Sequence, residues 1–296
     1  MKDFERQKGY LLIDLDDKDV VVEKSKYKKN QYWVYIDGEP YYFKNEGRNI
    51  SEVVAYHLAT NLGLPAVKYD LAKLGSINGV ISKSYEEEDK NYVGMLEILQ
   101  TYFINDPETI QQMGLLNLGP GCYNHDMTNL TAFWQALELY YKDDKRFDSK
   151  KIMDGLLDKF FFNILIHNFD DAAINYVIEE SKDDINFVPL FDNANMFTKC
   201  EKGMSVDFDK ENNDTMERTL EYFLRISDEE SVNRFLELYN KCDSNCMNDA
   251  IKKTEEQIGT YIQFSDDKFL VANFEYNRKR ITKVLTNIGL IENKEK

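Results

Sequence analysis

The sequence is short of basic residues, histidine and cysteine. Its 296 residues include 37 lysines and arginines against 53 aspartates and glutamates, which gives a formal net charge of -16. Nucleic acids and anionic membranes are bound mainly through basic surfaces, so this balance argues against both as partners. A short basic stretch, YNRKR near the C-terminus, is expected on an exposed helix face. Four cysteines are too few for a disulfide framework, and three histidines provide no zinc-type cluster.

Long apolar runs are also missing. The opening stretch MKDFERQKGYLLIDLDDKD has none that is long enough for a signal peptide, and no later segment approaches the length of a membrane span. We therefore expect a cytoplasmic protein that does not bind membranes. The 43% hydrophobic content is sufficient for a sizeable core.

The first part of the chain is dominated by strand signals. YLLIDL, DVVVEK and QYWVYIDGEPYYFK are such runs, and Asp37-Gly38 predicts a tight hairpin that ends at Lys44. NISEVVAYHLATNLGLP has apolar residues at helical spacing and predicts one helix after the hairpin. AVKYDLAKLGSINGVISKSY returns to strands, with a turn predicted at Asn78-Gly79.

Beyond the acidic stretch EEEDKN the pattern becomes helical. MTNLTAFWQALELYY has one apolar stripe, whereas KIMDGLLDKFFFNILIH is apolar on nearly all sides, as a helix in the centre of a lobe would be. The chain after SDEESVNRFLELYNKC is almost wholly helical. We therefore predict an α+β fold of two lobes, with a small β-rich N-lobe carrying one helix over residues 1–85 and a larger, mostly helical C-lobe over residues 86–296.

A group of acidic and amide residues surrounds a predicted hairpin. Asp170 stands five residues before Asn175 in NFDDAAIN, the strand-like runs NYVIEE and INFVPLF follow, and Asp192 comes directly after them in FDNA. In kinases an Asp orients or deprotonates the attacking hydroxyl, and an Asn and a second Asp bind the metal ion that bridges the nucleotide phosphates. A hairpin would return the second carboxylate to the edge that holds the first.

The Asp-Asn spacing alone is a weak signal, because both residues are common in loops. Lys44 at the end of a strand and Glu52 at the start of the next helix add to it, since a kinase needs a cation on the phosphates and a carboxylate to position that cation. Taken singly, Lys44 fits a solvated strand end and Glu52 fits a favourable first-turn acid. In this order along the chain, Lys44 and Glu52 followed by the acidic and amide residues around the hairpin together indicate a kinase.

At these positions the sequence resembles the HipA-like serine/threonine kinases, which are distant relatives of phosphatidylinositol kinases in fold. The likeness rests on YYFK, SEVVAYHLATNLGLPAVKYDLA, GVISKSY, LLDKFFFNILIHNFDDAAIN and VPLFDNA, which cover most of residues 31 to 195. The chain looks like the short members, which lack an extra N-terminal subdomain. The resemblance implies a bilobal kinase fold, ATP and Mg²⁺ as cofactors, transfer of the γ-phosphoryl group to Ser or Thr of a protein substrate, and a toxin or effector role with an antitoxin or regulatory protein as partner.

Matched by position, the resemblance assigns roles to nine residues. It implies a phosphate-binding lysine with its acidic partner, a catalytic base, two Mg²⁺ ligands and an interlobe hinge that meets adenine through its main chain. These are, in that order, Lys44 with Glu52, Asp170, Asn175 with Asp192, and Ser82, Lys83, Ser84 and Tyr85.

The sequence departs from the family pattern in two places. The family usually follows its catalytic Asp with an Arg-His pair, but Asp171 and Ala172 stand there, which motivates a pseudokinase acting as a nucleotide-dependent regulatory or binding module as the alternative function. The expected nucleotide loop, EKSKYKKNQYW, has no glycine and several lysines, and Ser25 within it is a candidate self-phosphorylation site. A small-molecule or lipid kinase is the other alternative, and the acidic charge disfavours lipid membranes.

Overall fold

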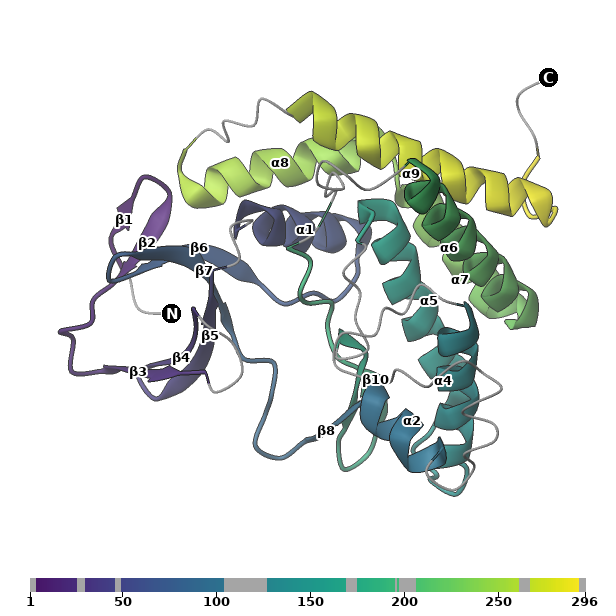
Figure 1. Cartoon of the computed structure of the whole chain (residues 1–296), viewed down its shortest axis with the longest axis horizontal. Helices are drawn as coiled ribbons and strands as arrows, with labels where there is room; N and C mark the ends of the chain where they lie inside the picture. The colour runs from purple at the N-terminus through teal and green to yellow at the C-terminus, as the bar shows by residue number, and fades with distance from the viewer. Residues whose placement is uncertain are drawn as a thin grey trace. The chain divides into compact units, whose positions relative to one another are not determined.

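The computed structural model describes residues 4–25, 30–45, 49–103, 127–168, 175–194, 196, 206–260 and 267–292. The chain forms two compact units (Figure 1). The first comprises Met1–Glu87 together with two later segments, Pro189–Met196 and Asp243–Ala272, and the second comprises Glu88–Val188, Phe197–Cys242 and Asn273–Lys296. The predicted boundary between lobes at residue 85 stays a prediction.

A seven-stranded sheet forms the body of the first unit. Its strand order is β1-β2-β6-β7-β5-β4-β3, and every neighbouring pair is antiparallel except β2 and β6, which are parallel. The strands are β1 (Arg6–Gln7), β2 (Tyr10–Ile13), β3 (Val20–Lys24), β4 (Gln31–Ile36), β5 (Glu39–Lys44), β6 (Tyr69–Leu74) and β7 (Ile77–Lys83).

The hairpin between β4 and β5 confirms the prediction from Asp37-Gly38. Both turn residues have positive φ, 54° for Asp37 and 81° for Gly38, as a two-residue type I′ turn requires. Val34, Ile36 and Phe43 of this hairpin are buried in the core of the sheet. Because successive side chains of a strand point to opposite faces, Lys44 leaves the sheet on the face opposite Phe43.

The turn predicted at Asn78-Gly79 was wrong, because both residues lie inside β7. The chain reverses at residues 75–76 instead, where Gly75 has a φ of 59°. Gly79 is needed for a different reason: a Cβ there would lie 2.4 Å from the carbonyl oxygen of Lys44 and 2.5 Å from the ring of Phe43. The missing side chain lets β7 approach the end of β5 closely.

Two helices complete the first unit. The predicted helix after the hairpin is α1 (Asn49–Leu62), which ends at Gly63 with a φ of 80°. The second is α8 (Ser244–Ile258), capped by Asp243 at its start and Gly259 at its end. Its buried stripe of Met247, Ala250, Ile251, Thr254 and Ile258 has helical spacing, and α8 packs against α1.

The second unit is mostly helical, as predicted, and carries a small sheet. β8 pairs with β9 and β9 with β10, all antiparallel, and β8 is a strand that the sequence analysis did not predict. Its elements are β8 (Asn91–Gly94), α2 (Met95–Phe103), α4 (Met127–Tyr140), α5 (Ser149–Ile166), β9 (Val177–Glu180), β10 (Ile185–Phe187), α6 (Val206–Ile226), α7 (Glu229–Lys241) and α9 (Asp267–Asn287), of which α9 lies mostly in this unit.

Helix α5 is the central helix of this unit. Phe160, Phe161 and Phe162, on three successive faces, are all buried, which confirms the interpretation of an all-round apolar helix as a core helix. Asp148 caps its first turn by accepting from the N–H groups of Lys150 and Lys151. Across the described ranges, no helix combines the length and the apolar character needed to span a membrane.

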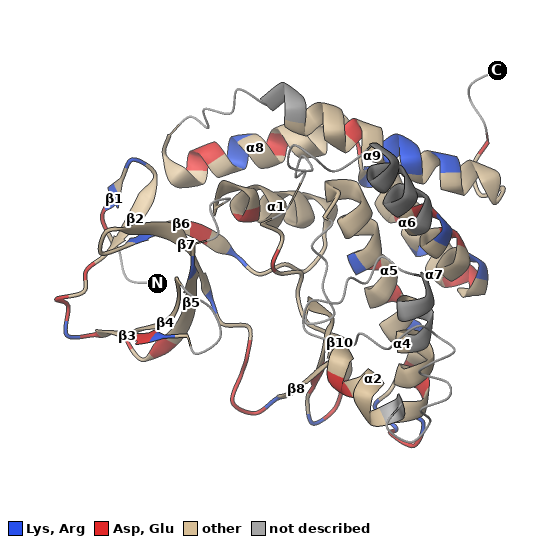
Figure 2. Cartoon of the chain, viewed as in Figure 1, with Lys and Arg blue, Asp and Glu red and all other residues tan. Residues whose placement is uncertain are grey.

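The exposed basic patch predicted from YNRKR was wrong. Figure 2 shows charges of both signs along α9. Arg280 is buried and donates to Glu217 at 3.1 Å, and Arg278 donates to the carbonyl of Cys242, so of these three basic residues Lys279 alone is exposed. The arginines bind elements of their own unit.

We predict that Gly79→Ala destabilises the protein by about 1–3 kcal/mol, because the added methyl group would overlap the main chain of β5. Gly94→Ala is the matched control, since Gly94 is also a strand glycine and a Cβ there meets nothing within 4 Å. Urea unfolding followed by circular dichroism measures both. Equal stabilities for the two variants would contradict the close approach at Gly79.

Candidate functional site

The candidate site of the first unit is built around the ammonium group of Lys44. Lys44 is 4% exposed, and its Nζ lies 2.5 Å from Oε1 of Glu52 and forms a second ion pair with Asp192. The pairing of Lys44 with Glu52 is the one expected from the sequence. Asp192, 148 residues further along the chain, joins the same cation.

Glu52 joins this cation to the segment that carries Asp192. It lies in the first turn of α1, its side chain is fully buried, and its Oε2 accepts from the main-chain N–H of Asn193 at 2.8 Å. Burial raises the pKa of Glu52, and the neighbouring Lys44 opposes that rise. The ionised form of Glu52 therefore depends on Lys44.

Main-chain hydrogen bonds bring Asp192 to this position. Leu190 donates its N–H to the carbonyl of Pro65 at 2.8 Å and accepts from the N–H of Val67 at 2.9 Å, so the chain just before Asp192 is bonded to the segment that leads into β6. Asp192 then takes a φ of 58°, a left-handed conformation that Asp tolerates better than most residues. Its side chain is 29% exposed, whereas that of Glu52 is not exposed at all.

Tyr69, at the start of β6, also contacts this cluster and was missed from the sequence. Its ring centroid lies 5.6 Å from Nζ of Lys44, and its hydroxyl oxygen is 3.4 Å from the main-chain nitrogen of Asp192. Burial raises the pKa of Tyr69, so the hydroxyl stays protonated. The only signal in the sequence was its place in the strand-like run AVKYDLAKL, and that signal has no specificity.

The predicted hinge lies at the end of β7. Ser84 donates its N–H to the carbonyl of Pro40 at 3.0 Å. Alternate residues of a strand direct their N–H and C=O groups to the same neighbour, so those of Ser82 also point toward β5. The N–H and C=O of Lys83 therefore point to the opposite side of β7. On that side β6 begins at Tyr69, opposite Ser82, so no residue of β6 lies opposite Lys83. The side chain of Lys83 is 60% exposed and pairs with Glu39.

Tyr85 of the predicted hinge and Ser25 of the predicted nucleotide loop also lie among the described residues. Tyr85 lies with its ring centroid 5.2 Å from that of Phe191, the residue before Asp192. Ser25 follows β3 and donates its N–H to the carbonyl of Gln31 at 2.9 Å. Lysines 26, 28 and 29 of the expected nucleotide loop lie outside the described residues, and the role of Ser25 stays a prediction.

In the second unit, the structure describes both ends of the predicted catalytic loop. His167 caps α5 in the left-handed conformation, with a φ of 51°, and Asn168 donates to Asn163 at 3.0 Å, which is a Schellman ending. Asn168 and Asn175 are 2% and 4% exposed. Asp170, with Asp171 and Ala172, lies outside the described residues, so its role and the joining of Asn175 with Asp192 stay predictions.

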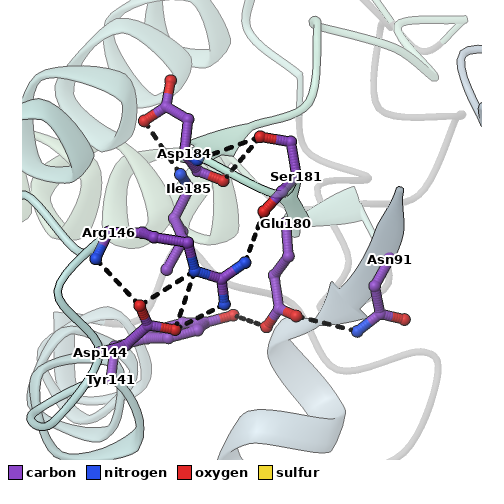
Figure 3. Close-up of polar contacts among 8 residues, drawn as sticks. All are labelled: Asn91, Tyr141, Asp144, Arg146, Glu180, Ser181, Asp184 and Ile185. Carbon is purple, nitrogen blue, oxygen red and sulfur yellow. Dashed lines mark hydrogen bonds and ion pairs between the residues drawn. The ribbon is translucent and has the colours of Figure 1, made fainter. Parts of the chain in front are cut away.

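The hairpin β9–β10, which follows Asn175, is fixed by a polar network (Figure 3). Glu180 accepts from the hydroxyl of Tyr141 at 2.7 Å and from Asn91 at 3.0 Å, and Arg146 donates to the carbonyl of Ser181 at 2.5 Å. Burial and the bond to Glu180 raise the pKa of Tyr141, which keeps the donor proton in place. The network ties the hairpin to β8 and to the chain that follows α4.

Lys44, Glu52, Asp192 and Tyr69 form what we call the Lys44 cluster. Its chemistry fits a site for phosphate and a metal ion. Two carboxylates share one ammonium group, which leaves a net negative charge beside a partly exposed Asp192. A divalent cation prefers such oxygen ligands, and a lysine is a common point charge for phosphate. The buried Glu52 is placed to orient the other two groups and is shielded from a ligand.

No family model matches the chain, and no curated protein matches it. Among solved structures, the Helicobacter pylori proinflammatory kinase CtkA matches with a TM-score of 0.58 at 17% identity, over 88% of this chain and 94% of that chain. The golgi casein kinase matches with a TM-score of 0.49 at 10% identity, over 92% and 74% of the two chains. HipA of Shewanella oneidensis MR-1, solved with HipB and operator DNA, matches with a TM-score of 0.44 at 13% identity, over 93% and 66%.

The likeness to CtkA shows the fold. The chain has a kinase-like α+β fold, with a β-rich N-terminal part and a helical C-terminal part, as the sequence predicts. At this level of identity the likeness carries no residue roles and no substrate.

We predict that Lys44→Met destabilises the protein in a pH-dependent manner. Without the ammonium group the pKa of Glu52 rises further. When the pKa of a carboxyl is higher in the folded than in the unfolded protein, the protein loses stability as pH rises from the lower of these two values to the higher. The loss relative to the original protein should be small near about pH 4 and reach about 3–5 kcal/mol near about pH 8. Urea unfolding across this range measures it.

The double variant Lys44→Met/Glu52→Gln is the control for this prediction. Replacing the buried acid by its neutral isostere should remove most of the pH dependence that Lys44→Met introduces. A loss of stability in Lys44→Met that is equal at both ends of the pH range would show that Glu52 does not depend on Lys44.

Proposed function

We propose that this protein is an ATP- and Mg²⁺-dependent kinase that transfers the γ-phosphoryl group to Ser or Thr hydroxyls of a protein. The observation that carries the proposal is the cation of Lys44 held between Glu52 of α1 and Asp192. A strand-end lysine, an acid in the next helix and an acid after a later hairpin are the parts with which kinases hold nucleotide phosphates. The kinase-like fold supports this reading.

In this proposal each residue of the cluster has one task. Lys44 places a positive charge on the α and β phosphates, and Glu52 keeps that charge in position from a site that solvent does not reach. Asp192, the more exposed carboxylate, binds Mg²⁺ together with Asn175. When bound, Mg²⁺ would neutralise charge on the β and γ phosphates.

The adenine is proposed to meet the main chain of the hinge. Since Ser82 and Ser84 direct their main-chain groups toward β5, the N–H and C=O of Lys83 are the pair available for a ligand on the opposite side. The proposal therefore assigns the adenine contact to the main chain of Lys83 alone among the four predicted hinge residues.

The chemical step is assigned to Asp170 on the resemblance. Its carboxylate would accept the proton of the substrate hydroxyl while the hydroxyl oxygen forms a bond to the γ-phosphorus, and the bond from that phosphorus to the β–γ bridging oxygen breaks to release ADP. A protein substrate, a toxin or effector role, and an antitoxin or regulatory partner rest on the same resemblance.

A pseudokinase is the second candidate function, and one observation favours it. Asp171 and Ala172 replace the Arg-His pair of the resembled family, which puts a negative charge where a basic group would stand near the transferred phosphoryl group. Such a protein would bind nucleotide at the Lys44 cluster and act as a regulatory or binding module. The two candidates share the nucleotide site and differ in turnover.

We predict that Lys44→Ala lowers the affinity for Mg-ATP by roughly tenfold or more, because a charge-assisted contact to phosphate is lost. Lys83→Ala is the matched control, since it keeps the main-chain groups proposed to meet adenine and removes only a strand-end side chain that points to solvent and to Glu39. It should change the affinity by less than about twofold. Isothermal titration calorimetry measures both, after circular dichroism has shown that each variant is folded, and equal affinities would remove Lys44 from the site.

We predict that Asp170→Asn reduces kcat by about 10²–10⁴ while it leaves the affinity for Mg-ATP within a few fold, because the residue acts on the acceptor hydroxyl. Phosphopeptide mass spectrometry after incubation with a host lysate and labelled ATP measures transfer. Asp171→Arg is the companion variant and should raise turnover if the added negative charge slows transfer. A protein that binds Mg-ATP, phosphorylates nothing and is indifferent to Asp170→Asn would be the pseudokinase.

A further inference from the structure

Gln257, near the end of α8, connects that helix to two elements of the candidate site. Its Nε2 donates to the main-chain carbonyl of Tyr69 at 2.9 Å, and its Oε1 lies 2.7 Å from Nε2 of His57 on α1. Because the amide nitrogen is used by Tyr69, the oxygen faces His57 and accepts from a protonated Nε2. Burial lowers the pKa of His57, and the bond to Gln257 opposes that shift, because the charged ring can donate the same bond from Nε2.

The other contacts of α8 anchor it along α1. Asn61 donates to the carbonyl of Cys246 at 3.0 Å and accepts from Lys253. The apolar stripe of α8 packs on the same helix. Thus α8, almost two hundred residues away from α1 in sequence, supports the helix that carries Glu52.

Both elements that Gln257 contacts lead to the Lys44 cluster. Tyr69 contacts the cation of Lys44 with its ring and the N–H of Asp192 with its hydroxyl, while its carbonyl is held by Gln257. α1 supplies Glu52, which holds Lys44 and the N–H of Asn193. The amide of Gln257 is therefore separated from Lys44 and Asp192 by one residue, Tyr69, and it also contacts the helix that carries Glu52.

We infer that Gln257 is a positioning residue for the nucleotide site, acting through Tyr69 on Lys44 and Asp192, and that α8 is the element through which that site is adjusted. The inference rests on the proposed function of the Lys44 cluster. It assigns to a C-terminal helix a part in nucleotide affinity that neither composition nor motif indicates. Any ligand or partner that displaces α8 would weaken Mg-ATP binding, and by reciprocity Mg-ATP would strengthen the attachment of α8.

The test compares Gln257→Leu with Lys253→Met in the full-length protein. Both remove a polar contact of α8, but Lys253 contacts Asn61 and has no bond to Tyr69. Calorimetry should show an affinity for Mg-ATP reduced by about 5-fold or more in Gln257→Leu and unchanged in Lys253→Met. Equal losses in the two variants, or none in Gln257→Leu, would overturn the inference.

Two further measurements make the outcome specific. In the double variant Gln257→Leu/Tyr69→Phe the losses should be less than additive, because both act on one path, whereas strict additivity would contradict that path. Hydrogen exchange without nucleotide should be faster at the Asn193 amide in Gln257→Leu than in Lys253→Met, and equal rates would refute the positioning role. If the original protein does not bind Mg-ATP, the proposed function fails, and the exchange comparison still decides the role of Gln257.

Discussion

The first unit depends on one buried cation shared by two carboxylates. Lys44 is nearly inaccessible, and the acids that neutralise it come from the first turn of α1 and from a segment more than a hundred residues later. Removing charges from water costs several kcal/mol for each ion, and a buried pair repays that cost only when its remaining oxygens are also satisfied. The bond from Asn193 to Glu52 supplies part of this compensation.

This arrangement is better explained by function than by stability. Apolar residues of similar size would often stabilise a core as well or better. In the proposed function, the two acids have separate tasks: the buried carboxylate of Glu52 orients the lysine, and the partly exposed carboxylate of Asp192 would bind a metal ion. Two local features near this cluster are energetically unfavourable for most residues: the left-handed main chain of Asp192 and the close approach of Gly79 to the main chain of Lys44.

The sequence predicted those parts whose signals are local. Asp37-Gly38, the helical spacing after it and the all-round apolar α5 each report on residues within one element, and the strand-end Lys44 with the helix-start Glu52 followed from that order. The turn near Gly79 was misplaced because an Asn-Gly pair predicts a turn from local sequence alone. Glycine is needed there because β7 closely approaches β5, and such a contact between two strands is not visible in one segment of sequence. Tyr69 and Gln257 could not be found, since their roles arise from contacts across 123 and 188 residues of chain. The buried Arg280 of YNRKR was missed for the same reason, as its partner Glu217 is 63 residues away.

The claim that Lys44 lies against nucleotide phosphates is tested most directly by an ATP acyl-phosphate, which acylates a lysine close to the bound phosphate chain. After proteolysis, mass spectrometry identifies the modified lysine with and without an excess of Mg-ATP. The account predicts that Lys44 is acylated and that Mg-ATP protects it, while exposed lysines such as Lys83 react weakly and without protection. Modification of exposed lysines alone, at the same level with and without Mg-ATP, would contradict it.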